Sequence, residues 1–389
     1  MMIRWLGPKT LRKKRVLVRV DFNVPIEKGR ILDDFRIRAH LPTLRMLLKN
    51  KNTIIILAHL GKPDGKKVPS LSLKPAAARL ARLLGKNVKL VSDPFSKSAV
   101  KKIESAESGS VFLVENIRFW KGEEKTDERF AGSLARLGEV FVQDAFGVIH
   151  RPHASVVELP RLMPSYGGLL LKKEIEALKP LVNRPLRPFV VIMGGAKIST
   201  KLHLLRAFVR RADRVLIGGA LANTVLAALG FPVGKSLLEK NILPMVRKIA
   251  LRDRKILFPH DVIAARSPRA AKFSAKSIGD IAKDDMILDI GNDARRMFIK
   301  ELKRAKTIFW NGPLGLVEKK EYALGTLAVA RSLRGIRAYK VIGGGDLVAF
   351  FEKHRLAKSV SHFATGGGSS LMFIAGFSLP GMRAMEKSK

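Results

Sequence analysis

The chain has 389 residues, 47% of them hydrophobic, which is enough for about two domains with sizeable cores. It contains no cysteine, so disulfides, cysteine-ligated zinc sites and thiol catalysis are excluded. Lys and Arg number 73 against 33 acids, and the formal net charge of +40 is dispersed along the whole chain, which favours anionic ligands.

The same charge permits nucleic-acid binding, which is the first rival function. The sequence has no zinc-finger or RNP-type motif, and its basic residues are not interleaved with aromatic ones as a stacking platform requires. We therefore expect only non-specific surface binding of nucleic acid. No signal-peptide core and no membrane-length apolar run is present, so we expect a cytoplasmic protein with no membrane partner.

Short β-rich runs alternate with helical patterns and predict an α/β protein with a mostly parallel sheet in each half. In the first half, the expected strands 16–20, 53–57, 111–114 and 140–142 each end in polar residues. Ligands of open parallel sheets bind beyond the carboxyl ends of the strands. The donors and charges gathered there predict a small-anion pocket, and they are Asp21, Asn23, Arg36, His59, Lys62, Arg118, His150, Arg151 and His153.

The second half opens with an expected strand, 189–193, followed by Gly194 and Gly195 and then by a helical pattern. Strand, glycine turn and helix together form a geometry that holds phosphate at the positive end of the helix. Lys197 and Lys201 are four residues apart, so both can reach one phosphate from the same helical face. The alternative is that the glycines only make a tight turn before an exposed lysine.

Three more glycine turns follow expected strands at 215–217, 341–342 and 363–364. Four such turns predict a nucleotide-binding domain, because glycines let a backbone approach phosphates and a purine. The turns contain Gly218 and Gly219, then Gly343, Gly344 and Gly345, and finally Gly367 and Gly368. Asp346 has two open interpretations, either the N-cap of its helix or a ligand of the Mg²⁺ that accompanies ATP.

Two further stretches need an interpretation. Residues 230–236 look like a Walker A loop, but only three residues separate the glycines and no strand directly precedes them, so we predict a helix ending near Gly230 and a loop. A helical stretch bounded by Gly167-Gly168 and Pro180 is the candidate interdomain helix, with hinges at its ends.

The motifs as a set resemble those of the phosphoglycerate kinase family over nearly the full chain. The first half has RVDFNVPI, DDFRIRAHLPTL, AHLGKP, SLSLKPAA, VENIRF and VQDAFGVIHRPHAS. The second half has MGGAKIS, IGGALANT, LFPHDVIAA, FWNGPLGLVE, IGGGDLVA and ATGGGSSL. The resemblance implies two Rossmann-like domains: 1–168 for 3-phosphoglycerate, an interdomain helix 169–182, 183–370 for the nucleotide, and 371–389 packing back on the first.

The resemblance also implies residue roles. Asp21, Asn23, Arg36, His59, Lys62, Arg118 and Arg151 would bind 3-phosphoglycerate. The nucleotide would meet Gly195, Lys197, Lys201, Gly218, Gly219, Asn311, Pro313, Glu318, Gly343, Gly344, Gly345 and Asp346, with Glu318 near the ribose and Asp346 near Mg²⁺. Arg36, Lys197, Lys201, Gly367 and Gly368 would face the moving phosphoryl group.

The implied reaction is reversible phosphoryl transfer between 1,3-bisphosphoglycerate and ADP, without a phosphoenzyme, by a monomer that closes its domains. The alternative is a weakened, kinase-like scaffold that binds RNA or another polyanion. The chain departs from the family pattern at Lys62, Gln143, Thr200, Leu347 and Met372, and at the turn containing Asn292 and Asp293. We expect each departure to lose a contact of the order of 1 kcal/mol if the site is buried.

Overall fold

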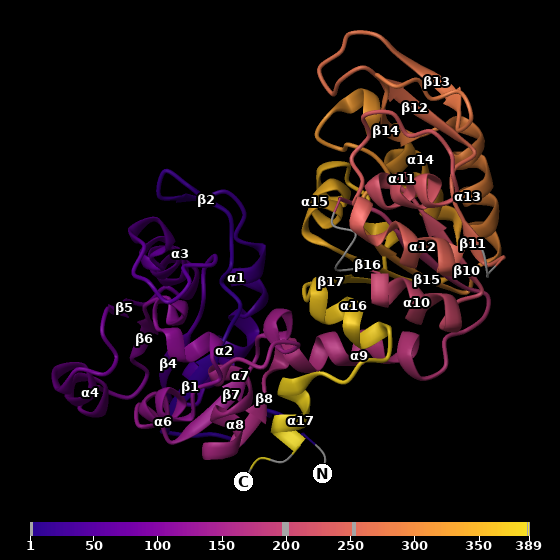
Figure 1. Cartoon of the computed structure of the whole chain (residues 1–389). Helices are drawn as coiled ribbons and strands as arrows, with labels where there is room; N and C mark the ends of the chain where they lie inside the picture. The colour runs from indigo at the N-terminus through magenta and orange to yellow at the C-terminus, as the bar shows by residue number, and fades with distance from the viewer. Residues whose placement is uncertain (1–2, 197–201, 251–253, 387, 389) are drawn as a thin grey trace. The chain divides into compact units, whose positions relative to one another are not determined.

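The computed structural model describes residues 3–196, 202–250, 254–386 and 388. The chain divides into two compact units, and Figure 1 labels most of the helices and strands of both. Unit 1 comprises Met1–Glu176 with Phe377–Lys389, and unit 2 comprises Ala177–Gly376. Within the described ranges, no helix is both long enough and apolar enough to cross a bilayer.

Unit 1 is built on a six-stranded parallel sheet with the order β5-β6-β4-β1-β7-β8. Its strands are β1 (Arg15–Arg19), β4 (Thr53–Leu57), β5 (Val88–Val91), β6 (Val111–Val114), β7 (Val140–Gln143) and β8 (Ser165–Gly167). A short hairpin of β2 (Ile26–Glu27) and β3 (Arg30–Ile31) stands outside the sheet.

Helices cover both faces of the unit 1 sheet, because successive residues of its strands enter different cores. Val16 and Val18 of β1 belong to one buried cluster, whereas Leu17 belongs to another. Such burial on both faces is typical of parallel sheets and explains why their strands are continuous apolar runs. The helices are α1 (Phe35–Ala39), α2 (Leu41–Lys49), α3 (Lys74–Leu84), α4 (Lys97–Glu104), α5 (Lys121–Glu124), α6 (Glu128–Ala135), α7 (Ala154–Val157) and α8 (Leu159–Leu162).

The C-terminal helix α17 (Pro380–Glu386) belongs to unit 1 and packs on α7, α8 and β8 (Figure 1). Its close approach requires Gly381, where an added Cβ would lie 2.6 Å from Ile149 Cγ1 and 2.7 Å from Val156 Cγ1. The amide of Gly381 also donates to the carbonyl of Ile149 at 3.0 Å.

Unit 2 has its own six-stranded parallel sheet, in the order β11-β10-β9-β15-β16-β17. Its strands are β9 (Phe189–Met193), β10 (Arg214–Ile217), β11 (Ile256–Leu257), β15 (Thr307–Asn311), β16 (Tyr339–Gly343) and β17 (His362–Ala364). Its helices are α10 (Leu202–Arg211), α11 (Gly219–Ala228), α12 (Leu243–Ala250), α13 (Asn292–Arg304), α14 (Leu324–Ser332), α15 (Gly345–Lys353) and α16 (Gly368–Ile374).

A second, antiparallel sheet in unit 2 was not anticipated from the sequence. It has the order β13-β12-β14 and consists of β12 (Asp261–Ala265), β13 (Phe273–Ser277) and β14 (Met286–Ile290). Helix α11 contacts β14. The sheet therefore supplies one wall of the space beside α11, where the pocket described below lies.

Two sequence expectations about helix ends have opposite outcomes. Helix α9 (Leu169–Asn183) continues through Pro180, so the expectation that this proline bounds the helical stretch was wrong, whereas the range 169–182 implied by the resemblance ends within one residue of the helix. A proline removes one amide donor without necessarily ending a helix. Around Gly230 the prediction is confirmed, because α11 ends at Ala228 and Gly230 has a φ of 91° in the loop that follows.

Candidate active site

Asp21 follows β1, and its carboxylate orders the start of a cationic group of side chains. Arg36 Nη1 donates to Asp21 Oδ2 at 2.9 Å, and the amide of Asn23 donates to Asp21 Oδ1 at 3.1 Å. Burial would raise the pKa of Asp21, but the charge of Arg36, helped by the hydrogen bond from the Asn23 amide, outweighs it and lowers the pKa to about 2. Asp21 is therefore an ionised anchor for Arg36 and not a proton acceptor at neutral pH.

Arg118 lies beyond the end of β6 and is almost completely buried. Its Nη1 donates to the carbonyl of Gly61 at 2.7 Å, while Asn23 Oδ1 accepts from the amide of Gly61 at 3.0 Å. Burial, with help from the nearby charges of Arg19 and Arg151, lowers the pKa of Arg118 to about 10. Its Nη2 is buried without a hydrogen-bond partner among the described residues, which leaves a donor for an anion.

Three histidines accompany these arginines and are neutral at physiological pH. Burial, reinforced by the charge of Arg151, lowers the pKa of His150 to about 4. Burial and then Arg118 lower the pKa of His153 to about 3. His59 is fully buried, and desolvation lowers its pKa well below the usual value despite Asp21.

We call Arg36, Arg118, Arg151, His59, His150 and His153 the cationic cluster. Fixed positive charge comes from its arginines, and the neutral imidazoles add hydrogen-bonding capacity without charge. This combination suits a small ligand that carries carboxylate or phosphate groups. Lys62 is exposed in the loop after β4 and makes no salt bridge with the described acids.

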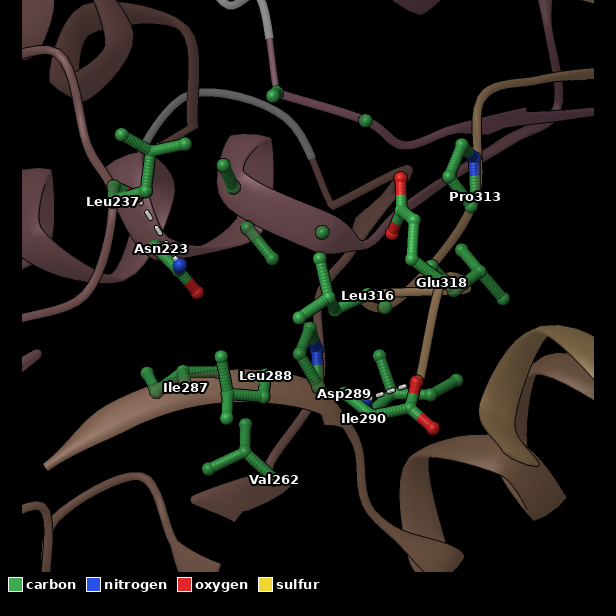
Figure 2. Close-up of a pocket in the computed structure, with 18 of the residues that line it drawn as sticks. Asn223, Leu237, Val262, Ile287, Leu288, Asp289, Ile290, Pro313, Leu316 and Glu318 are labelled. Atoms are coloured by element: carbon green, nitrogen blue, oxygen red, sulfur yellow. Dashed lines mark hydrogen bonds between the residues drawn. The ribbon is translucent and has the colours of Figure 1, made fainter. Parts of the chain in front are cut away.

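Unit 2 contains a mostly apolar pocket at the end of its parallel sheet (Figure 2). Among the residues expected at the nucleotide, the pocket is lined by Gly195, Gly219, Pro313, Glu318 and Asp346. Its volume is about 180 Å³, below the roughly 300–1,000 Å³ of pockets for drug-sized ligands. It can therefore enclose only part of a ligand of that size.

Sequence reasoning missed the apolar wall and two polar members of this pocket. The wall includes Leu237, Val262, Leu288 and Leu316, which come from a loop, from β12 and β14, and from the segment after β15. The polar members are Asn223 on α11 and Asp289 on β14. The motif IGGALANT contains Asn223, but the sequence does not tell which of its side chains faces a ligand.

The glycines at the ends of β9 and β15 allow two backbones to touch. The amide of Gly195 donates to the carbonyl of Pro313 at 2.8 Å, and a Cβ on Gly194 would lie 2.0 Å from that same oxygen. Gly218 is similarly enclosed, since its Cβ would lie 2.5 Å from Leu314 Cδ2. Gly218 therefore packs behind the pocket, whereas Gly219, with a φ of 61°, lines it.

The third glycine turn leads into α15. An added Cβ on Gly343 or Gly344 would lie 3.3 Å from Asn311 Nδ2, so Asn311 packs against this turn and does not line the pocket. Gly344 is the N-cap of α15, and Asp346 is the second helical residue. The N-cap interpretation of Asp346 was therefore wrong, because its exposed carboxylate faces the pocket rim and caps no amide.

The remaining expected residues lie in two segments. Lys197, Lys201 and Thr200 are outside the described residues. Gly367 has a φ of 51° and is the N-cap of α16, and Gly368 is the first residue of that helix. An added Cβ on Gly367 would meet no atom of the described residues within 4 Å, which leaves the backbone here open to a ligand on the side of those residues.

Comparison with known proteins explains why the cationic cluster and the apolar pocket occur in one chain. A family model described as phosphoglycerate kinase matches residues 8–377. The chain belongs to the phosphoglycerate kinase family. A phosphoglycerate kinase of Pelotomaculum thermopropionicum is 43% identical over 390 residues, covering 98% of this chain and 99% of that protein. One from Moorella thermoacetica is 42% identical over 382 residues, covering 97% of each.

Solved structures of the phosphoglycerate kinase family agree in fold. That of phosphoglycerate kinase from Coxiella burnetii has a TM-score of 0.83 and 36% identity, covering 97% of this chain and 98% of the other. That from Pyrococcus horikoshii OT3 has a TM-score of 0.88 and 30% identity, covering 99% of both chains. The prediction of two α/β domains, each with a largely parallel sheet, is thereby confirmed.

Two departures from the phosphoglycerate kinase pattern are compensated within this chain. Leu347 is fully buried in the apolar core of unit 2, so it contributes packing at this position. At the substituted turn before α13, Asp261 accepts from the amides of Asp293 and Ala294 at 2.9 and 2.7 Å. The carboxylate thus caps the helix, and the expected loss of contacts does not hold at this turn.

Proposed function

We propose that the protein catalyses reversible phosphoryl transfer between 1,3-bisphosphoglycerate and ADP, giving 3-phosphoglycerate and ATP. In one direction the P–O bond to the carboxyl oxygen breaks and a P–O bond to the terminal oxygen of ADP forms. The observation that carries the proposal is that this chain, a member of the phosphoglycerate kinase family, has the cationic cluster in unit 1 and a glycine-rimmed, apolar pocket in unit 2. These suit a small acid and a nucleotide, respectively.

The cationic cluster is the proposed site for 3-phosphoglycerate, together with Asp21, Asn23 and Lys62. The carboxylate of Asp21 already forms an ion pair with Arg36. No general base is needed, because the carboxyl group of 3-phosphoglycerate is ionised at neutral pH and attacks directly. The arginines would orient the acid and neutralise charge as the phosphoryl group moves.

The pocket of unit 2 is the proposed nucleotide site, with Glu318 near the ribose and the glycine turns along the phosphates. We propose that Mg²⁺ accompanies the nucleotide at Asp346. The exposed carboxylate on the first turn of α15 fits this ion, which prefers oxygen ligands and usually binds one or two carboxylates plus substrate phosphates. The described residues contain no group of three acids or histidines that could form a complete metal cage, so phosphates would supply further ligands. Bound Mg²⁺ would neutralise phosphate charge.

The resemblance supports the remaining roles. Arg36, Lys197, Lys201 and the amides of Gly367 and Gly368 would surround the phosphoryl group in flight. We further propose domains at 1–168 and 183–370, an interdomain helix at 169–182, and a C-terminal segment 371–389 associated with the first domain. Closure of the two domains on each other would exclude water from the acyl phosphate. We also propose that the protein is a monomer and is located in the cytoplasm.

A coupled assay of Mg-ATP-dependent phosphorylation of 3-phosphoglycerate, at moderate salt, tests this function. Robust turnover is the expected result. Absent turnover, with calorimetry still detecting both ligands, would contradict it and return attention to the polyanion-binding scaffold, which no comparison supports. Binding to RNA should weaken steeply between low and physiological salt if only surface charge is involved.

A further inference from the structure

Asn223 is a polar side chain in the apolar part of the unit 2 pocket. It lies on α11, is only 2% exposed, and lines the pocket together with Leu237 and Ile287. Figure 2 places it across the pocket from Glu318. A buried amide needs partners for both its donor and its acceptor atoms.

The orientation of the Asn223 amide follows from the hydrogen bond that it makes to Leu237. Its Nδ2 donates to the carbonyl oxygen of Leu237 at 3.2 Å, and a carbonyl can only accept. Oδ1 must therefore be the other end of the amide, and it has no hydrogen-bond partner among the described residues. An unpaired acceptor in an apolar pocket favours a ligand that brings a donor to it.

We propose that Asn223 is a specificity residue that selects a 6-amino purine over a 6-oxo purine. The inference rests on the proposed function and assigns the base to the apolar part of the pocket. An adenine base presents an exocyclic N–H donor, which Oδ1 accepts. A guanine base presents an oxygen at the same position, so two acceptors would face each other and guanine is disfavoured.

Three nucleoside diphosphates test the proposal by calorimetry: ADP, GDP, and the diphosphate of unsubstituted purine riboside, which lacks the exocyclic amino group. The parent should bind ADP roughly tenfold more tightly than either of the others, the value of about one hydrogen bond. In Asn223→Ala, the affinity for ADP should fall to that of the purine analogue. The ratio between the two ligands should therefore approach one.

The ratio separates recognition from a structural role. Asn223 also holds the loop at Leu237, so a merely structural effect would weaken all three nucleotides by the same factor, and an unchanged ratio overturns the proposal. Thr224→Val is the matched control, because Thr224 is buried on the same helix, hydrogen-bonds Ala220 and Glu239, and does not line the pocket. This variant should retain the parent ratio.

Two further outcomes are distinguishable. If Asn223→Ala does not fold, Asn223→Leu, which keeps the side-chain volume and has no acceptor, gives the same comparison. If the parent binds ADP with no preference over the purine analogue, the specificity role is overturned while the proposed function stands. If the parent binds none of the nucleotides at up to millimolar concentration, both are overturned.

Discussion

His40 Nδ1 lies 2.7 Å from Asp144 Oδ2, and both side chains are buried. The other ring nitrogen, Nε2, accepts a hydrogen bond from the amide of Asp21 at 3.0 Å, so the proton sits on Nδ1. Asp144 Oδ1 accepts from the amides of Leu170 and Leu171 at 2.9 and 3.3 Å. One imidazole thus joins the segment that carries Asp21 to the first turn of α9.

Substitution of His40 by Ala should disturb both ends of this series of hydrogen bonds, at Asp21 and at Asp144. It leaves the Asp21 amide and one Asp144 oxygen without their partner, and we expect the free energy of unfolding to fall by roughly 2–4 kcal/mol. Affinity for 3-phosphoglycerate should fall as Asp21 loses its position, whereas affinity for ADP should not. Denaturant unfolding and calorimetry measure these effects.

Thr43→Val is the control for this variant. Thr43 Oγ1 accepts from the amide of Leu169, so the substitution weakens the same turn of α9 by about 1 kcal/mol without touching Asp21. Its affinity for 3-phosphoglycerate should equal that of the parent. Equal losses of affinity in both variants would show that His40 acts only through stability.

Arg36→Ala should strongly reduce affinity for 3-phosphoglycerate and turnover while leaving ADP binding unchanged. The change removes a cation of the cluster and the ion-pair partner of Asp21. Arg38→Ala is a close control, because Arg38 lies on the same helix but pairs with Asp34 at 2.7 Å. Parent-like kinetics for Arg36→Ala, or a matching loss in Arg38→Ala, would remove Arg36 from the site.

The sheets were predictable because a parallel strand buried on both faces is a continuous apolar run. Strands β4 and β6 occupy the residues expected, 53–57 and 111–114. The antiparallel sheet was not predictable in the same way. Strand β13, Phe273–Ser277, is largely exposed and reads FSAKS, so it carries no apolar run that would distinguish it from a loop.

The site was predictable where motifs carry it and unpredictable where distant residues meet. The glycine turns and Asp21 follow their strands directly, so position in the sequence located them. His40 and Asp144 are 104 residues apart, and Asn223 and Leu237 are 14 apart, so only the fold brings them together. The lowered pKa of His153 likewise depends on the fold, because it arises first from burial and then from the charge of Arg118, 35 residues away in the sequence.

The histidines of the cationic cluster should make unit 1 sensitive to mild acid. The pKa values of His150 and His153 are about 4 and about 3 in the folded protein, against an ordinary value of 6.5. As pH falls below 6.5, the unfolded chain therefore binds protons that the folded chain does not. Stability should be highest above pH 6.5 and should fall progressively toward pH 3–4.

His153→Gln should flatten this pH dependence, by about 1 kcal/mol or more between pH 7 and pH 4. The comparison must be between variant and parent, because other groups titrate too. Asp21, whose pKa is about 2, contributes stability that is lost only as pH falls from 3.8 toward 2. Asp289 in unit 2, whose pKa burial raises to about 7, acts in the opposite sense. Urea unfolding at a series of pH values measures the free energy of unfolding of both proteins. If that free energy falls equally with pH in His153→Gln and in the parent, the assignment is contradicted.

Gly345→Ala separates the role of a glycine in folding from its role in ligand binding. Gly345 is the first residue of α15, and an added Cβ would lie more than 4 Å from every neighbouring atom in the part of the chain that the structure describes. The free energy of unfolding should therefore be unchanged, or higher by up to about 1 kcal/mol because Ala favours helix. Affinity for ADP should nevertheless fall tenfold or more, since the methyl group would occupy space at the positive end of the helix where a phosphate approaches.

Gly335→Ala provides the reference for Gly345→Ala. Gly335 also faces open space in unit 2, but it lies away from the pocket lining, so ADP affinity should remain that of the parent. Thermal unfolding and calorimetry of the two variants together decide the matter. If Gly345→Ala binds ADP as the parent does, the phosphates do not approach the start of α15, and the assignment of Mg²⁺ to the neighbouring Asp346 loses its basis.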